Sequence, residues 1–357
     1  MERFVVIMAG GSGTRLWPIS TKGRPKQFIQ VDENGCMLVQ TIERLCGTVA
    51  ADHCYIVTNK DLLDITRDAV KDLIPVSNII PEPENKNTAA CIAYTTKILK
   101  KKFGNGLLCF VPADGYVKDR KGYKESIELA YDAAEKTGSL VVVGITPTYP
   151  ATGYGYIQID RDRGDDERVL AVQKFIEKPD LETAKKFMAS GEFLWNGGIL
   201  VGSMDSIIDS IKTFLPEHDR LIGEALQSAG AEADNKYMED AYNKLQNISF
   251  DNGVLEKIDC IYVIRGSFDW DDIGSLEALS RTLPADPLGN VSNGRHFGLE
   301  TSNSVIYSED AFITTIGVDN LIVASTRDAI IVCPRSRAQD VKGLVELLKS
   351  SGYRELL

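Results

Sequence analysis

The chain has 357 residues, of which 43% are hydrophobic and 25% are charged. This length is about twice that of a usual domain, and the composition is that of an ordinary globular protein, which excludes collagen, coiled coils and disordered chains. The formal net charge is −11, and the longest basic run is Lys100–Lys102, which is too short to neutralise a row of nucleic-acid phosphates. No nucleic-acid partner is therefore expected.

Cysteine usage and hydropathy indicate the compartment. The seven cysteines form no C-x-x-C pair, and several lie in apolar runs, a pattern typical of a reducing compartment. No apolar run approaches the length needed to cross a bilayer, and a strand pattern begins directly after Met1-Glu2-Arg3. We therefore expect a cytoplasmic protein without a membrane partner.

Taken in chain order, strand-like apolar runs alternate with helical patterns over the first half of the sequence. Strands are predicted at residues 4–8, 54–58, 79–80, 107–111 and 140–143, and helices at residues 37–46, 62–73, 88–101 and 123–136. Such alternation predicts an α/β fold with a mostly parallel sheet and helices on both faces. Ligands of such sheets bind in the loops that follow the strands.

The rest of the chain departs from this alternation. Residues 154–202 mix strands with a short helix, which predicts an inserted substrate-binding region. Pro, Gly and Asp gather near residues 284–290, and short, closely spaced strands follow before a last helix at about 338–350. We therefore predict two domains, residues 1–286 and residues 287–357, of which the second is a small β-rich module.

The loop after the first strand reads Gly10-Gly11-Ser12-Gly13-Thr14-Arg15. Glycines allow backbone N–H groups to approach phosphate oxygens, although α/β proteins also use glycine in plain tight turns. The loop lacks the lysine of a P-loop, and Leu16 stands where a dinucleotide fingerprint needs glycine. Arg15 and the nearby Lys26 add the fixed positive charge that a departing pyrophosphate needs.

Together with this loop, a series of segments resembles the family of nucleoside-diphosphate-sugar pyrophosphorylases. The segments are MAGGSGTRLWPIS at 8–20, PKQF at 25–28, NKNTAA at 85–90, PAD at 112–114, ATGYGYI at 151–157, FIEKP at 175–179, FLWNGGI at 193–199 and FDWDDIGSL at 268–276. They span most of residues 1–280 in the order of the family. The resemblance implies a GT-A-like, Rossmann-like catalytic domain with a mixed sheet, followed by a module like a short left-handed β-helix. Such modules often contribute to dimer contacts, so a homodimer is expected.

The resemblance also implies roles for single residues. The residues implied for the nucleotide are Ala9, Gly10, Gly11, Gly13, Thr14, Arg15, Lys26, Asn87 and Asp114. Those implied for the sugar phosphate are Gly153, Tyr154, Glu177, Lys178 and Asn196. Asp114 and Asp272 would hold Mg²⁺, and the catalytic set would be Arg15, Lys26, Asp114, Lys178 and Asp272. Without the resemblance, Asp114 would be taken for a turn or cap residue and Lys178 for a solvated lysine.

Within the family, the chain is most similar to enzymes that join GTP to mannose 1-phosphate and release pyrophosphate. It departs from the usual pattern at Gly115, where the family has His, and at Leu276, where it has Trp. A related transferase for another sugar phosphate, such as heptose 1-phosphate, or for another base stays open, as does a catalytically silent sensor of sugar nucleotides. The broken dinucleotide fingerprint disfavours a nicotinamide oxidoreductase.

Overall fold

Two units, each discontinuous in sequence, make up the chain in the computed structural model, which describes residues 1–11, 13–32, 34–160, 167–228 and 235–357. The first unit contains residues 1–10, 42–112 and 117–269, and the second contains residues 11–41, 113–116 and 270–357. The predicted glycine-rich loop thus begins at the end of the first unit and continues into the second. The domain boundary predicted after residue 286 stays a prediction.

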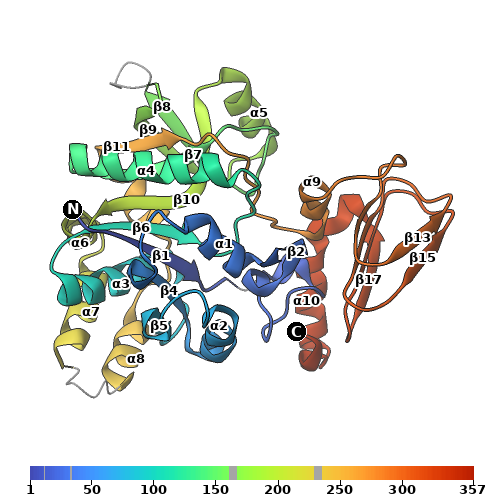
Figure 1. The fold of residues 1–357 in the computed structure, drawn as a ribbon, viewed down its shortest axis with the longest axis horizontal. Coiled ribbons are helices and arrows are strands. Elements are labelled where there is room, and N and C mark those ends of the chain that lie inside the picture. The colour runs from blue at the N-terminus through green and yellow to red at the C-terminus, as the bar shows by residue number, and fades with distance from the viewer. Residues whose placement is uncertain (12, 33, 161–166, 229–234) are drawn as a thin grey trace. The chain divides into compact units, whose positions relative to one another are not determined.

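A mixed sheet forms the centre of the first unit, with nine strands among the described residues in the order β5-β4-β1-β6-β10-β7-β11-β9-β8 (Figure 1). The strands are β1 (Arg3–Ala9), β4 (Cys54–Asn59), β5 (Ile79–Glu82), β6 (Leu107–Pro112), β7 (Leu140–Ile145), β8 (Gly155–Asp160), β9 (Val169–Glu177), β10 (Phe193–Ser203) and β11 (Ile261–Arg265). The run from β5 to β6 is parallel, and β10 is antiparallel to β6 and β7. The predicted α/β fold with a mixed sheet is confirmed.

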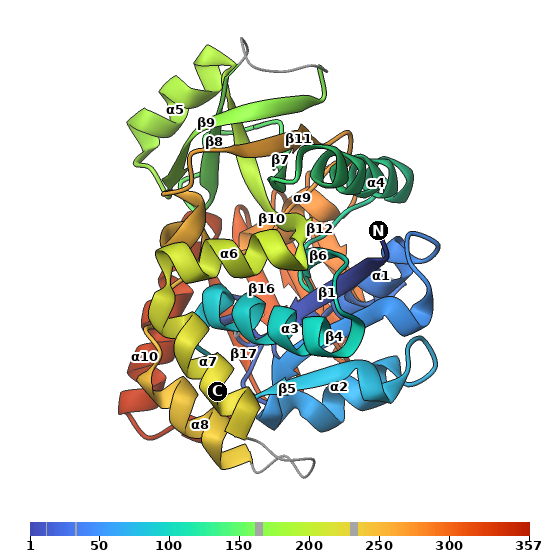
Figure 2. The same ribbon diagram turned by 90° about the vertical axis from the view of Figure 1, so that its left-hand side faces the viewer.

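Helices cover both faces of this sheet (Figures 1 and 2). Phe4 and Val6 of β1 share an apolar cluster with residues of α3 and α6, whereas Cys109 of β6 contacts Tyr131 of α4 on the opposite face. The alternation of strand side chains between the two faces explains this division. The helices of the unit include α2 (Leu63–Val70), α3 (Asn87–Phe103), α4 (Arg120–Thr137), α5 (Leu181–Ser190), α6 (Met204–Phe214), α7 (Pro216–Ser228) and α8 (Asn235–Lys244), with short turns η3 (Ala51–His53), η4 (Lys60–Leu62) and η5 (Val76–Asn78).

The second unit contains the β-rich end of the chain. Strands β12, β14 and β16 pair in parallel, and β17 pairs with β16 in antiparallel fashion. Strand β13 pairs in parallel with β15. Such stacked parallel strands are the arrangement expected of a β-helix-like module. Its elements are β12 (Val291–Asn293), β13 (His296–Leu299), β14 (Val305–Ser308), β15 (Ile313–Ile316), β16 (Leu321–Ser325), β17 (Ile330–Pro334), η8 (Arg335–Asp340), α10 (Val341–Ser350) and η9 (Arg354–Leu356).

The glycine-rich loop shares its apolar core with this module. Leu16, Trp17 and Ile19 are buried in one cluster with Val305 and Val341, and the Trp17 indole donates a hydrogen bond of 2.8 Å to the carbonyl oxygen of Leu356. The other elements of the unit are η1 (Thr14–Leu16), η2 (Lys26–Phe28), β2 (Gln30–Asp32), β3 (Gly35–Cys36), η7 (Leu276–Ala278) and α9 (Leu279–Thr282), and α1 (Met37–Leu45) crosses between the units in sequence.

Across the described residues, no helix combines the length and the apolar character that crossing a bilayer demands.

Candidate active site

Two backbone carbonyl groups, at the end of β1 and at the start of the glycine-rich loop, accept hydrogen bonds from side chains. The Ala9 oxygen accepts a hydrogen bond of 3.1 Å from the Thr58 hydroxyl, and the Gly10 oxygen accepts one of 2.8 Å from the Asn85 amide. Asn87, two residues further on, begins α3 with a positive φ of 68°, and its side-chain oxygen accepts the N–H of Thr88. The structure thus places the 85–88 segment against the start of the loop.

Gly13 explains why the loop needs glycine. Its φ is 58°, and a Cβ atom added to it would lie 2.6 Å from the Cβ atom of Lys26. Any other residue would therefore suffer both backbone strain and a clash. Thr14 and Arg15 follow with exposed side chains in η1, while Ser12 lies outside the described residues.

Lys26 is at the centre of the charged groups in the second unit. The side chain is only 9% exposed, and its ammonium donates to Asp114 Oδ2 at 2.7 Å and to the backbone oxygen of Asp272. Gly11 lies on the same side, because a Cβ atom there would be 3.9 Å from Asp114 Oδ2. The structure therefore brings together three predicted site residues that are far apart in sequence, beside the glycine loop.

Asp272 lies in a turn that only a special backbone conformation can form. Its Oδ1 atom accepts the N–H of Gly274 at 3.0 Å, and Ile273 between them has a φ of 42°. A β-branched residue in this region costs about 1–3 kcal/mol, which the surrounding contacts must offset. A Cβ atom on Gly274 would lie 2.9 Å from Asp272 Oδ2, so glycine is needed for the carboxylate to fold back over the turn.

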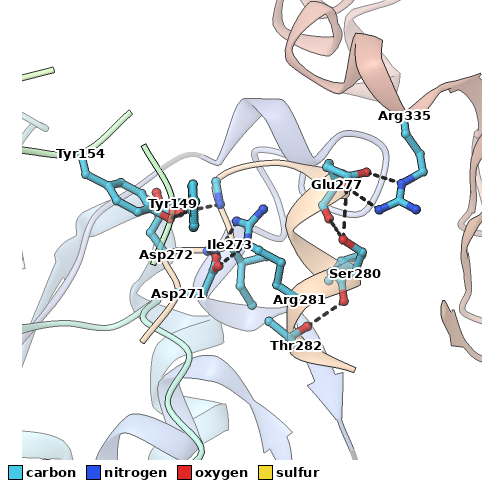
Figure 3. Close-up of polar contacts among 12 residues, drawn as sticks. Tyr149, Tyr154, Asp271, Asp272, Ile273, Glu277, Ser280, Arg281, Thr282 and Arg335 are labelled. Carbon is cyan, nitrogen blue, oxygen red and sulfur yellow. Dashed lines mark hydrogen bonds and ion pairs between the residues drawn. The ribbon is translucent and has the colours of Figure 1, made fainter. Parts of the chain in front are cut away.

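The neighbour Asp271 anchors this turn. It is 8% exposed, and its backbone exchanges hydrogen bonds of 2.8 and 3.0 Å with Tyr116 in the segment that carries Asp114. Its carboxylate accepts the N–H of Ile273 and a two-pronged contact from Arg281 of α9 (Figure 3). Sequence reasoning selected Asp272 in this motif and missed both Asp271 and Arg281.

The residues present fit a divalent cation of the Mg²⁺ type. Asp114 and Asp272 are hard oxygen donors, and Lys26 contacts both residues. Mg²⁺ is commonly held by one or two carboxylates together with substrate phosphates and water. Among the described residues, no group of three or more His, Cys, Asp or Glu side chains could hold a metal ion.

At Gly115, where the family has His, the Trp270 indole comes close to the backbone. A Cβ atom on Gly115 would lie 3.1 Å from the Nε1 atom of Trp270. A larger residue in this position would have to displace that indole ring, because 3.1 Å is tighter than ordinary contact distances. In this chain, the Trp270 indole thus lies against the backbone at Gly115, directly after Asp114.

In the first unit, the predicted sugar-phosphate residues Glu177, Lys178 and Asn196 lie close together. Glu177 ends β9 opposite Gly155, and a Cβ atom on Gly155 would lie 2.6 Å from Glu177 Oε2 and 3.5 Å from the Cβ atom of Asn196. The Lys178 ammonium pairs with Glu177, and Lys178 has a positive φ of 47°. Asn196 precedes an irregularity in β10 at Gly197–Gly198, a feature that often redirects a side chain beside a functional site.

Asp251 joins these residues, and sequence reasoning missed it. It begins the π-helical segment η6 (Asp251–Leu255), and its Oδ1 atom accepts the Asn196 amide at 2.6 Å, while Asn196 Oδ1 accepts the N–H of Gly198. Burial, followed by the nearby charge of Glu177, raises the pKa of Asp251. No sequence pattern marks Asp251, because its partners come from distant strands; π-helical turns do, however, recur at functional sites.

Tyr154, another predicted sugar-site residue, is part of an aromatic cluster. Its hydroxyl accepts from that of Tyr149 at 2.9 Å, and both rings pack edge-on against Trp195 at 5.1 and 4.9 Å between centroids. Trp195 is buried, as expected for a scaffold residue. Gly153 is exposed, with open space where a Cβ atom would lie, so the structure gives it no close neighbour.

Comparison with known proteins identifies the class. Residues 4–286 match the model of the nucleotidyl transferase family, and residues 294–348 match that of the MannoseP isomerase/GMP-like beta-helix domain. The chain therefore belongs to the nucleotidyl transferase family. It is an enzyme of this type, whose substrates are a nucleotide and a sugar phosphate, and the family generally uses a divalent metal.

The chain is also similar to individual proteins of known sequence or structure. The chain is 35% identical to mannose-1-phosphate guanylyltransferase of Klebsiella pneumoniae, over 98% of this chain and 74% of that protein. It is similar in structure, with a TM-score of 0.87 and 31% identity, to a protein described as mannose-1-phosphate geranyltransferase from Thermus thermophilus, over 98% of this chain and 100% of the other. A mannose-6-phosphate isomerase from Helicobacter pylori matches with a TM-score of 0.62 and 25% identity, over 76% of this chain and all of that one.

Proposed function

We propose that this enzyme transfers the guanylyl group of GTP to mannose 1-phosphate, with GDP-mannose and pyrophosphate as products. The observation that carries the proposal is the Lys26 ammonium held between Asp114 and Asp272 beside the glycine loop. This arrangement suits a polyphosphate and a divalent cation, and the relative from Klebsiella pneumoniae named for this reaction supports the choice of base and sugar.

In the proposed reaction, a phosphate oxygen of mannose 1-phosphate attacks the α-phosphorus of GTP in line. The new P–O bond forms as the bond to the bridging oxygen breaks, and pyrophosphate leaves with the electron pair. The attacking phosphate is already ionised at neutral pH, so no protein base or nucleophile is needed. Catalysis then consists of positioning the two anions and neutralising charge.

Each group of site residues has one task in this scheme. Arg15, Lys26 and the backbone from Gly10 to Gly13 bind the triphosphate, with Ala9, Thr14 and Asn87 around it. Glu177 and Asn196 bind sugar hydroxyls, and Lys178 binds the sugar phosphate, while Gly153 and Tyr154 line the sugar. Asp114 and Asp272 would hold Mg²⁺, which would supply positive charge to the phosphate oxygens.

The test is to incubate the protein with Mg²⁺, mannose 1-phosphate and each of the four nucleoside triphosphates, and to measure pyrophosphate. We expect release that depends on both substrates and is fastest with GTP. A panel of other sugar 1-phosphates, including heptose 1-phosphate, tests the sugar. Release with a different pair would redirect the proposal to that pair, and GDP-mannose binding without any release would indicate a sensor.

A further inference from the structure

A partly buried ion pair lies beside the turn that carries Asp272. The Asp271 carboxylate is bound by Arg281 of α9 through Nε to Oδ2 at 2.6 Å and through Nη2 to Oδ1 at 3.1 Å (Figure 3). Two-pronged arginine–carboxylate contacts fix orientation as well as charge. Neither residue belongs to the groups assigned above to the nucleotide, the sugar phosphate or the metal.

The backbone is held on both sides of Asp272, and the Asp271 carboxylate of the ion pair holds one of these sides. On one side, Asp271 exchanges two backbone hydrogen bonds with Tyr116. On the other side, Asp271 Oδ1 accepts the N–H of Ile273 at 2.8 Å, and Ile273 has a φ of 42°. Asp272 therefore lies between Asp271, whose backbone is bound to Tyr116, and Ile273, whose N–H is bound by the Asp271 carboxylate. That carboxylate is in turn held by Arg281.

The segment that carries Arg281 is itself held by an ion pair. Its segment begins with η7, where Glu277 forms a two-pronged ion pair with Arg335 at 2.7 and 2.9 Å (Figure 3). Arg335 also donates to the backbone oxygen of Asn303 at 2.8 Å. The helical turn that carries Arg281 is thus attached to the β-rich module on the side away from Asp271.

We infer that Asp271 and Arg281 are positioning residues that set the Asp272 carboxylate for the divalent cation. This inference rests on the proposed function, in which Asp114 and Asp272 hold the metal. Partners behind a metal ligand fix its orientation, and their replacement typically lowers metal affinity or activity about 10- to 100-fold. A merely structural pair would instead lower the stability of the protein without a selective effect on the metal.

The experiment measures the affinity for GTP with and without MgCl₂ in the full-length protein, by calorimetry. The ratio of the two dissociation constants is the metal-dependent gain in affinity. In Arg281→Met we expect this gain to fall about 10- to 100-fold, while the affinity without metal stays within about twofold. Arg337→Met is the matched control, because Arg337 pairs with Asp340 on the exposed surface of the same unit.

Asp271→Asn provides a second variant if Arg281→Met does not fold. It keeps an oxygen that can accept the Ile273 N–H and removes the buried charge, so we expect a smaller loss in the same direction. An unchanged metal-dependent gain in a folded variant overturns the inference, as does an equal loss of affinity with and without metal. A wild-type protein with no such gain also overturns it, even if pyrophosphate is released. The proposed function fails on a different result, namely metal-dependent GTP binding without pyrophosphate release.

Discussion

In the proposed reaction, Lys26 is the side chain on which binding of the triphosphate depends most directly. Its side chain is almost fully buried, and its ammonium contacts Asp114 and Asp272. We expect Lys26→Ala to lower the turnover number about 100- to 1000-fold, as loss of one preorganised charge-stabilising group does in other enzymes. Pyrophosphate release measures the rate, and a circular-dichroism melt checks that the variant is folded.

Lys22→Ala is the matched control for this change. Lys22 lies in the same loop region with an exposed side chain, so its loss is expected to leave the turnover number within about twofold. We expect Lys26→Ala to fold, because Asp114 is about one-third exposed and water can solvate its carboxylate in the absence of Lys26. A folded Lys26→Ala variant with a near-normal rate would rule out the assigned role.

The contact between Asp251 and Asn196 leads to a separate prediction about binding of the sugar phosphate. Its carboxylate fixes the Asn196 amide at 2.6 Å, so Asp251→Ala leaves that amide without its partner. We expect the KM for mannose 1-phosphate to rise about tenfold, which corresponds to the loss of one buried hydrogen bond, with little change in the KM for GTP. Steady-state kinetics with each substrate varied in turn provides the measurement.

Two other variants delimit this prediction. Asp251→Asn keeps an oxygen that can accept from Asn196, so its KM is expected to lie close to that of the wild type. Asp209→Ala removes an exposed acid of α6 and controls for loss of negative charge. Equal increases in both KM values for Asp251→Ala would contradict a role confined to the sugar.

At the residue scale, the sequence predicted some groups and missed others for physical reasons. Lys26, Asp114 and Asp272 were predicted through their motifs, and the structure brings them together, although their roles stay predictions. Asp271 was missed because its partner, Arg281, carries no motif. Asp251 was missed because a single acid outside any pattern gains meaning only from neighbours that the fold supplies.

At the scale of elements, β5, α3 and α8 enclose a titratable group away from the proposed site. Glu82 ends β5 and is 7% exposed; it accepts a hydrogen bond of 3.0 Å from the Tyr242 hydroxyl of α8. Burial raises the pKa of Glu82 to about 7. The folded protein therefore favours the neutral acid, whereas the unfolded chain ionises near the ordinary value of 4.5.

The sign of the resulting pH dependence follows from these two pKa values. The stabilising contribution of neutral Glu82 is fully present below about pH 4.5 and is lost as the pH rises through about 7. The difference between the two pKa values corresponds to a change in the free energy of unfolding of about 3 kcal/mol. Glu82→Gln stays neutral, so we expect its free energy of unfolding to exceed that of the wild type by more at pH 8 than at pH 5.

Denaturant unfolding at both pH values tests this expectation. Glu84→Gln is the control, because Glu84 is exposed two residues further on. Parallel pH profiles for the wild type and Glu82→Gln would show that Glu82 is ionised in the folded protein as it is in the unfolded chain.

The elements themselves were predicted unevenly. Strands such as β1 and β6 were found because a buried parallel strand leaves a continuous apolar run between turn residues. The inserted region predicted at residues 154–202 included most of β10 (Phe193–Ser203), whereas β10 lies in the main sheet between β6 and β7. The antiparallel pairing of β10 with β6 joins residues that are 90 or more positions apart in the chain, Leu200 and Phe110 for example, and local patterns do not specify it.

At the scale of the whole chain, the division at residue 286 stays a prediction, and the compact units of the structure are each discontinuous in sequence. The loop residues Leu16, Trp17 and Ile19 belong to the apolar core of the β-rich module. This grouping could not be predicted from the local composition of the sequence, because an apolar residue in a loop does not reveal which distant element will bury it. One consequence is that substitutions in the core of the module also alter the packing of the residues that follow the glycine-rich loop.

The β-rich module also bears on association between copies of the chain. Phe297 and Leu299 of β13 and Ile316 of β15 are exposed, and Leu299 lies opposite Ile316 in the register of the two strands. Exposed apolar side chains grouped on one sheet often mark an interface, and most homo-oligomers are two-fold dimers. We expect light scattering to detect a dimer and Ile316→Glu to shift it toward the 39.3 kDa monomer. Leu181→Glu, at an exposed apolar position of α5, is expected to leave the dimer intact, and a wild-type protein that is monomeric at all concentrations would contradict the prediction.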